Sequence, residues 1–459
     1  MNLFRKESLD RYLGTDQKFV KSLTAFDLIA LGVGAVIGTG IFILPGTVAA
    51  VDAGPGVILS FFFAAIVCAL AGMCYAEFSS ALPVAGSAYS YGNVVFGEII
   101  GWILGWALIL EYMLAVAAVS TGWAAYFNSL LASVGIKLPA ALSGPFDPAH
   151  GTYINLIAVI IVLAITAMLA HGMNTSMRVN NIAVVIKIAI IVIFIAVGIL
   201  FIKPGNYHPF LPYHMTGVFQ GATTVFFAFL GFDAISSSAA EVKNPRKNMT
   251  TGIIGTLLIA TILYMGVAAV LVGMVKYTKL NVANPVAFAL EMVHQNWLAD
   301  ILSIGALIGM FTMMVTMIYS SSRLVYSIGR DGMLPTFLAK LDPHTSVPKN
   351  ALWVVALIIA FMGGLVSLDH LTSLVNIGTL LAFTFVSFGI IPLRRNKEIS
   401  NQGGFKVPLY PVFPILSGIA CLAMMCLLKK ETFIGAAIWF AIGLLLYFSY
   451  GYRHSKLNH

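Results

Sequence analysis

The chain has 459 residues, of which 59% are hydrophobic and 10% are charged, whereas a soluble domain usually carries about 25% charged residues. So few charges cannot cover a soluble surface, which excludes a soluble enzyme, a nucleic-acid-binding protein and a disordered scaffold. Uncharged runs longer than about 18 residues favour membrane-spanning helices, and a helical bundle satisfies the backbone of such runs in lipid. We interpret the net charge of +8 as basic residues held in cytoplasmic loops.

Twelve apolar spans follow one another, each long enough to cross a bilayer at about 1.5 Å of rise per residue. They cover residues 25–50, 55–80, 97–127, 153–172, 178–202, 217–241, 251–276, 297–325, 350–367, 371–392, 410–428 and 432–450. The predicted organisation is a cytoplasmic N-terminal segment, two repeats of five helices, two final helices and a cytoplasmic tail. These parts cover residues 1–24, 25–202, 217–392, 410–450 and 451–459.

The distribution of basic residues predicts the orientation of the chain. If the N-terminus is cytoplasmic, the cytoplasmic segments hold 19 of the 26 lysines and arginines, the external segments hold six, and Lys187 lies inside a span. This asymmetry places both termini in the cytoplasm of a multi-pass protein of the plasma membrane. An even number of spans suits a carrier or a channel and argues against a seven-span receptor.

The first span contains an unusual cluster of glycines. Gly38, Thr39 and Gly40 lie together near its middle, and Pro45 follows. Glycine in the middle of a helix costs up to about 1 kcal/mol relative to alanine, so the glycines either allow a neighbouring helix to approach closely or mark a break. Their clustering favours a break that leaves backbone groups available to a ligand.

The sixth span shows the same peculiarity, because Gly231 and Asp233 lie near its centre within the run FFAFLGFDA at 226–234. Interruptions at corresponding positions of two halves indicate the substrate site of a transporter. The start of a half-helix offers amide donors that suit a carboxylate, and its end offers carbonyls that suit an ammonium group. The pattern predicts a site for an L-amino acid, with the carboxylate at residues 38–40 and the ammonium near Ile37 and 227–230.

Three charged residues lie deep in apolar spans, namely Glu111, Lys187 and Asp233. Such residues usually face the bundle interior or a cavity. In one interpretation they form buried salt bridges, Lys187 with Glu111 or with Asp233, whose net value is often small. In the other they couple transport to protons, because burial disfavours the charged form of a lysine, so that Lys187 exchanges a proton near neutral pH.

The remaining acids, among them Glu77 and Glu98, lie near span ends and are interpreted as caps or interfacial charges. The sequence contains no metal-binding spacing, no nucleophile–base arrangement and no phosphate-binding loop, so it predicts no metal, no cofactor and no enzymatic activity. The sequence predicts no particular protein partner.

Four motifs in order resemble the amino acid–polyamine–organocation superfamily, and within it the cationic amino acid transporter group. They are GAVIGTGIF at 34–42, FFAFLGFDA at 226–234, EVKNPR at 241–246 and SIGRDGMLP at 327–335. The resemblance runs over nearly the whole chain. It implies an all-α membrane protein with the leucine-transporter fold, in which two five-helix inverted repeats are followed by two further helices, and a secondary transporter that works by alternating access.

The resemblance also implies roles for single residues. Residues 37–41 resemble the segment that binds the substrate backbone, and Phe227 resembles the aromatic that closes over the substrate. Lys187 matches a lysine that takes the place of a sodium ion in proton-coupled members, Glu111 looks like the acid of the third helix, and Tyr264 resembles a gate residue.

The predicted function is proton-coupled symport of L-amino acids, with small neutral substrates such as alanine preferred and cationic ones possible. Met317 restricts the size of the side chain. Sodium-coupled or exchange transport, an amino-acid-gated channel and a sensor are the alternatives. The predicted substrate-binding residues are Ile37, Gly38, Thr39, Gly40, Ile41, Glu111, Phe227, Ala228, Leu230 and Met317. The predicted proton-coupling residues are Lys187, Asp233 and Glu111, and the predicted gate residues are Phe227 and Tyr264.

Overall fold

The computed structural model is helical throughout the residues that it describes, which contain three isolated β-bridges and no strand. The described residues are 3–6, 21, 23–83, 87–171, 177–237, 239, 242–343, 345, 347–396, 399 and 404–456. Glu241, the first residue of one of the four motifs, lies outside them.

The helices follow the predicted spans closely. In chain order they are α2 (Ala25–Val36), α3 (Thr39–Phe42), α4 (Leu44–Val48), α5 (Val57–Ala81), α6 (Ser87–Val95), α7 (Glu98–Ser133), α8 (Leu156–Ala170), α9 (Met177–Gly198), α10 (His214–Val225), α11 (Phe232–Ser237), α12 (Pro245–Met274), α13 (Pro285–Met292), α14 (Asn296–Arg330), α15 (Lys349–Leu365), α16 (Leu368–Arg395), α17 (Val412–Cys426), α18 (Lys430–Leu446) and α19 (Tyr452–His454). Each of the twelve predicted spans overlaps at least one of them. Helices α6 and α13 lie in predicted loops, where their short length gives no span signal.

Eight helical stretches among the described residues are long and apolar enough to cross a membrane. Four more apolar helices are shorter, namely α2, α8, α15 and α17, with 12, 15, 17 and 15 residues. One long stretch, Leu44–Ala81, joins the end of the first predicted span to the second. Short helical turns at residues 49–56 fill the connection that the sequence placed between these spans.

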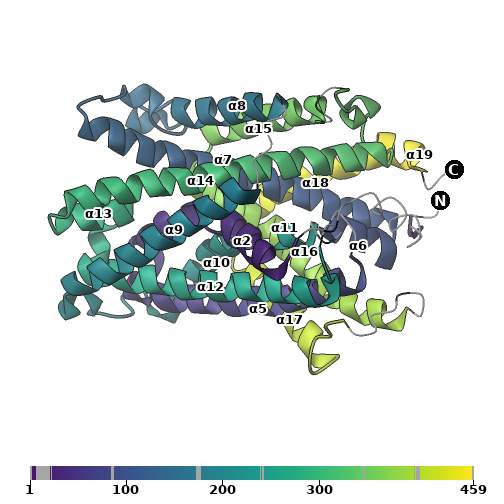
Figure 1. Ribbon diagram of the computed structural model, residues 1–459, viewed down its shortest axis with the longest axis horizontal. Helices are drawn as coiled ribbons and strands as arrows, with labels where there is room; N and C mark the ends of the chain where they lie inside the picture. Colours follow the sequence, from purple (N-terminus) through teal and green to yellow (C-terminus); the bar gives the residue numbers. More distant parts are fainter. Residues whose placement is uncertain are drawn as a thin grey trace.

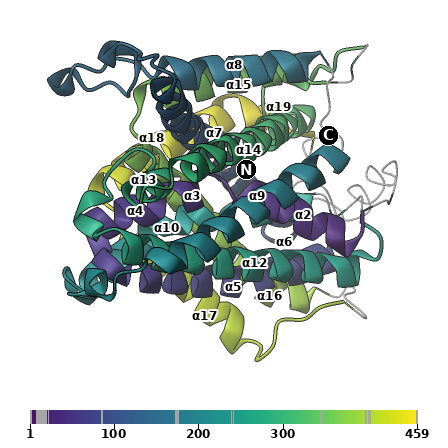
Figure 2. The ribbon, with the colours of Figure 1, turned by 60° about the vertical axis from the view of Figure 1, so that its left-hand side comes forward.

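The long helices run roughly along one direction, and α2 and α11 lie among them rather than at an edge (Figure 1). Helices α8 and α15 pack side by side along one edge in both views (Figure 2). Helix α5 packs against α12, and α7 packs against α14 and α16. The two interrupted helices are therefore enclosed by long, continuous ones that fix their positions.

The outer surface is apolar where a soluble protein would be polar. Ile434 and Ile438 of α18 are 62% and 58% exposed, and α17 presents Ile415, Leu416 and Ile419 in the same way. Lys187, in contrast, is completely buried. Apolar side chains outside and charged groups inside are the arrangement that a lipid solvent favours.

Glu77 corrects one prediction, because it is a buried ion-pair partner and not an interfacial charge. Its carboxylate lies 2.6 Å from Nε and 2.7 Å from Nη2 of Arg394 on α16, and it also accepts the amide of Val407 at 2.6 Å. Residues 77 and 394 are 317 positions apart, so no local pattern reveals the pair. The contact joins α5 to α16 and to the segment that leads into α17.

Glu98 is buried in a similar way at the start of α7. Its carboxylate accepts hydrogen bonds from Arg5, from the Tyr447 hydroxyl at 3.0 Å and from the Ser455 hydroxyl at 3.0 Å. Glu98 was predicted to be a cap or an interfacial charge. It lies in the first turn of α7, as a capping acid does, but it is buried and contacts residues near both ends of the described chain. Helix α18 is further joined to α7 by stacking of Trp439 on Trp106, with ring centroids 4.6 Å apart.

Candidate functional site at two broken helices

The first interruption separates α2 from α3. Helix α2 ends at Val36, Ile37 is extended, and Gly38 has φ −133° and ψ −136°. Helix α3 then begins at Thr39. The predicted break is therefore present at the glycine cluster, and the first amides of α3 have no acceptor within their own helix.

The second interruption separates α10 from α11. Residues 226–229 form a 3₁₀ turn, Leu230 is extended, and Gly231 has φ +106° before α11 begins at Phe232. A Cβ atom at position 231 would also lie 3.1 Å from the backbone of Ala35 and 3.1 Å from Cε of Met317. Only glycine combines this backbone conformation with so close a contact, which explains the glycine that marked this span.

The two interruptions touch each other. A Cβ atom on Gly40 would lie 2.6 Å from both Cα and Cβ of Ala228. The hydroxyl of Tyr264 on α12 lies 2.9 Å from the carbonyl oxygen of Val36 and 2.7 Å from that of Ala228. One side chain therefore contacts the broken ends of both helices, and Tyr264 lies at the breaks rather than at a rim of the bundle.

Lys187 reaches from α9 to the end of α2. Its Nζ atom donates to the carbonyl oxygens of Gly34 and Ile37, each at 2.9 Å, and the side chain is completely buried. Among the described residues it forms no ion pair with Glu111 or Asp233, so the salt-bridge interpretation is wrong. The carbonyl of Ile37, which was predicted to face the substrate ammonium, accepts Lys187 instead and keeps one lone pair for another donor.

Glu111 and Asp233 form a separate acidic group. Asp233 lies in the first turn of α11, where the helix dipole favours a negative charge, and its Oδ2 accepts the Tyr112 hydroxyl at 3.1 Å. Glu111 is 2% exposed, lies near enough to Asp233 to interact electrostatically, and has Thr379 of α16 beside it. Both carboxylate oxygens of Glu111 and Oδ1 of Asp233 are buried without a hydrogen-bond partner in the described structure.

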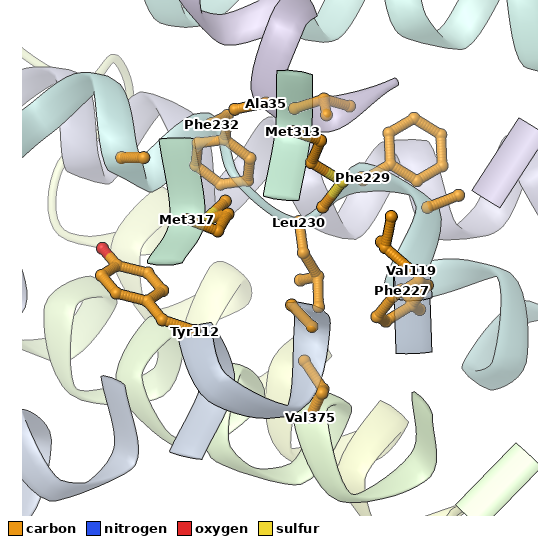
Figure 3. Close-up of a cluster of buried hydrophobic side chains, with 14 of the residues drawn as sticks. Ala35, Tyr112, Val119, Phe227, Phe229, Leu230, Phe232, Met313, Met317 and Val375 are labelled. Carbon is orange, nitrogen blue, oxygen red and sulfur yellow. The ribbon is translucent and has the colours of Figure 1, made fainter. Parts of the chain in front are cut away.

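The side chains beside the breaks form a buried apolar cluster (Figure 3). Leu230 lies at the centre of this group in the view, with Met313 of α14 above it, Met317 of α14 to its left and Val375 of α16 below it. The sulfur of Met313 occupies the position that a methyl group on Gly38 would need, at 2.5 Å. Met317, which the sequence singled out, is thus one of two methionines at the site.

Sequence reasoning missed several residues of this site. Met313 lies one helical turn before Met317, so the rule that residues four apart share a helix face would have identified it. Val119 of α7 lies beside Phe227 in Figure 3 and 3.6 Å from the position of a methyl on Gly38. Tyr112 adjoins Glu111 in sequence, but its bond to Asp233 spans 121 positions and leaves no local signal.

A family model described as amino acid permease matches residues 23–448. The chain belongs to this amino acid permease family. The matched region contains both interrupted helices, Lys187 and the acidic group.

Close relatives of this permease are bacterial transporters. A methylthioribose transporter of Bacillus subtilis is 48% identical over all of this chain and 99% of its own length. The branched-chain amino acid permease BcaP of the same organism is 45% identical over all of this chain and 99% of its own length. A vacuolar cationic amino acid transporter 4 of Arabidopsis thaliana is 34% identical over 82% of this chain and 64% of its own length.

The family membership confirms the resemblance read from the motifs. The permease is a multi-pass, all-helical membrane protein, and its relatives are permeases and transporters rather than enzymes. The roles of the individual site residues stay predictions, and the geometry above supplies the physical grounds on which each can be tested.

Proposed function

We propose that this permease is a proton-coupled symporter that carries neutral L-amino acids across the plasma membrane by alternating access. The observation that carries the proposal is the position of Lys187, whose ammonium group lies 2.9 Å from the carbonyl oxygens of Gly34 and Ile37 at the end of α2. Backbone carbonyls at a broken helix are the ligands that a coupling cation uses in such folds. A protonated lysine supplies the same positive charge from within the chain.

The coupling follows from the two states of this amine. Protonated, Lys187 holds the end of α2 by two charge-assisted hydrogen bonds. When the proton leaves, the charge disappears, the two bonds weaken and α2 is released from α9. Because the same two carbonyls cannot hold sodium and the ammonium together, the geometry favours protons over sodium as the coupling ion.

The substrate backbone fits the two interruptions. The amides at the start of α3, around Thr39 and Gly40, suit the carboxylate. The carbonyls around residues 227–230 suit the ammonium group, with the second lone pair of Ile37 beside them. Phe227 lies next to Leu230 and Val119 at this position (Figure 3), as expected of a residue that closes over a bound molecule.

The side-chain space supports a neutral, apolar substituent. Met313, Met317, Leu230 and Val375 surround it with apolar atoms, and these would leave the charged end of arginine or lysine without a partner unless Glu111 reaches it. Alanine-sized to branched side chains fit this surface best, and the similarity to BcaP points the same way. Competition by arginine tests the cationic alternative.

The arrangement of helices supports two inverted repeats over residues 25–202 and 217–392. The interruptions fall in the first helix of each half, and helices of equal rank in the two halves pack against each other, as in the pairs α5–α12, α7–α14 and α8–α15. With cytoplasmic termini, a thiol introduced at the exposed Lys456, in a chain whose exposed Cys426 is replaced by serine, would react only with reagents that enter the cell. Reaction with an impermeant reagent in intact cells would reverse the proposed orientation.

A second candidate substrate is an uncharged thio-sugar, which the methylthioribose transporter carries by its name. One observation favours it here: the carboxylate oxygens of Glu111 and the Oδ1 atom of Asp233 lie unpartnered beside an apolar surface with two methionines. Sugar hydroxyls would donate to those oxygens, and a methylthio group would pack on Met313 and Met317.

Uptake by purified protein in liposomes tests these alternatives together. Labelled L-valine, L-alanine or methylthioribose is offered with an inward proton gradient, with an inward sodium gradient, or with no gradient and preloaded unlabelled substrate. Concentrative uptake on the proton gradient alone supports the proposal. A requirement for sodium, or uptake only after preloading, would replace it with sodium coupling or exchange, and flux that never saturates would indicate a channel.

The Lys187→Ala variant assigns the coupling residue. Proton-driven uptake is expected to disappear, whereas the matched variant Lys203→Ala, which removes an exposed lysine beyond the end of α9, keeps the wild-type rate. If proton-driven uptake survives in Lys187→Ala, the coupling role is refuted and the role of this lysine is structural.

A further inference from the structure

Helix α14 meets α9 through two glycines on one face. Gly305 and Gly309 are four residues apart, in the small-xxx-small spacing that lets membrane helices approach closely. A methyl group on Gly305 would lie 1.9 Å from Cδ1 of Ile190, and one on Gly309 would lie 3.0–3.2 Å from three side-chain carbons of Lys187. Ile190 and Lys187 are three residues apart and share one face of α9.

The stem of Lys187 therefore lies on bare backbone. Its Cγ, Cδ and Cε atoms pass over Gly309, and its Nζ atom then reaches Gly34 and Ile37 at 2.9 Å. The side chain is fixed at both ends, by α9 at its Cα atom and by two carbonyls at its ammonium group. A displacement in the middle of the stem must consequently move the ammonium group away from the carbonyls.

We propose that Gly309 is a positioning residue for Lys187, because its missing side chain leaves the path along which the lysine reaches the broken end of α2. The inference rests on the coupling role proposed for Lys187 and adds a second residue to it. Glycine is a poor residue for a helix interior, and this contact gives position 309 a reason to be glycine that helix packing alone does not.

The helices that pack against α9 carry their charged side chains away from Lys187. On α2, which packs on α9, the charged residue is Asp27 at the opposite end, and on α14 the charged residues nearest to Gly309 in sequence are Asp300 and Arg323, nine and 14 positions away. On α12 the titratable side chain at the breaks is Tyr264, which contacts the carbonyls of Val36 and Ala228. The acids Glu111 of α7 and Asp233 of α11 form a separate group without an ion pair to Lys187 among the described residues, and the atoms nearest to a methyl group on Gly309 would be carbons of Lys187. We therefore attribute a change in the pH dependence of transport in a Gly309 variant to the lysine.

The first experiment compares the pH dependence of proton-driven uptake in Gly309→Ala and Gly266→Ala. Gly266 of α12 makes a matched contact to the same helix, since its methyl would lie 2.9 Å from Cδ1 of Ile195. Hydrogen bonds to an ammonium group favour its charged form, so a displaced Lys187 binds protons less tightly. We expect the midpoint to move to lower pH by about half a unit or more in Gly309→Ala, a threefold loss of proton affinity, and to stay unchanged in Gly266→Ala. A lower rate with an unchanged midpoint would overturn the inference.

The second experiment needs no transport. The thermal unfolding temperature of purified protein is measured for Gly309→Ala in the wild-type and in the Lys187→Ala background, as a double-mutant cycle. Gly309→Ala is expected to lower this temperature in the wild-type background and to have little effect once the lysine stem is gone. Equal effects in both backgrounds would mean that the methyl group clashes elsewhere and would refute the positioning role. If instead the cycle shows coupling while Lys187→Ala retains proton-driven uptake, the contact stands and only the proposed function fails.

Discussion

Gly40 and Ala228 bring the backbones of the two broken helices into contact, because a methyl group on Gly40 would lie 2.6 Å from the Cα atom of Ala228. Both atoms of Ala228 in this contact are fixed by the 3₁₀ turn of residues 226–229. No rotamer change can relieve the overlap, so the spacing of the two interruptions depends on glycine at position 40.

Gly40→Ala is therefore expected to separate the interruptions and to lower uptake about tenfold or more, with an overpacking cost of about 1–3 kcal/mol. Gly205→Ala is the control, since nothing lies within 4 Å of a methyl group there. The measurements are initial uptake rate and thermal unfolding temperature. Wild-type uptake in Gly40→Ala would show that the breaks tolerate separation.

Tyr264→Phe removes the hydroxyl that contacts the carbonyls of Val36 and Ala228. Leaving a buried polar group unpaired costs about 1–3 kcal/mol, so the unfolding temperature should fall, and uptake should fall with it because both broken ends lose a shared contact. Tyr207→Phe is the matched control, because Tyr207 lies in the turn of residues 204–207 and its hydroxyl donates to the carbonyl oxygen of Ala269 on α12 at 2.9 Å. It is expected to lose stability without losing transport, and equal transport in both variants would refute a role for Tyr264 as a gate.

The positions of Met313 and Met317 predict that these two side chains limit the size of the substrate side chain. Met317→Ala and Met313→Ala each enlarge the apolar space at the breaks, so leucine and phenylalanine should compete with labelled alanine at lower concentrations than in the wild type. Each change also costs about 2–5 kcal/mol because it removes a buried side chain. Met274→Ala, a buried methionine of α12, carries a comparable cost and should leave the competition profile unchanged. An identical profile in all three variants would contradict the assignment.

The pair of Glu77 and Arg394 predicts a stability effect away from the site. Glu77→Ala leaves the Arg394 guanidinium without its carboxylate, and breaking a buried pair from one side costs about 3–5 kcal/mol. Asp369→Ala removes an exposed ion pair of the same kind with Lys429, which is worth about 0–1 kcal/mol. Thermal unfolding of the two variants should differ accordingly, and equal unfolding temperatures would show that residue 77 contributes no more than a surface charge.

The fold could be predicted from the sequence to the extent that its signals are local. Glycines at 38 and 40, and Gly231 next to Asp233, disturb otherwise apolar spans, and the structure breaks both helices at those positions. The order of the apolar helices follows from the order of the apolar spans in the sequence. Helix α6 was not predicted, because its nine residues lie between two apolar spans and were assigned to a loop.

The contacts within the site could be predicted only in part. The burial of Lys187 follows from its depth in a span. Its partners, however, are backbone carbonyls about 150 positions away, and a sequence cannot indicate them because every residue has a carbonyl. The sequence therefore offered only charged side chains as partners, and one of the two interpretations paired the lysine with acids that form a group of their own. The pairing of Glu77 with Arg394 was hidden for the same reason of distance.

The contacts at Glu98 give the chain a property that none of its helices has alone. Arg5 and Ser455 bind the same buried carboxylate, and the Arg5 guanidinium also lies 5.0 Å from the centre of the Tyr452 ring, so the described chain closes into a noncovalent ring. If opposite forces were applied to the two ends in a single-molecule pulling experiment, the first event would be the opening of this closure. The ring would yield at Glu98 before any turn of a membrane helix unwinds.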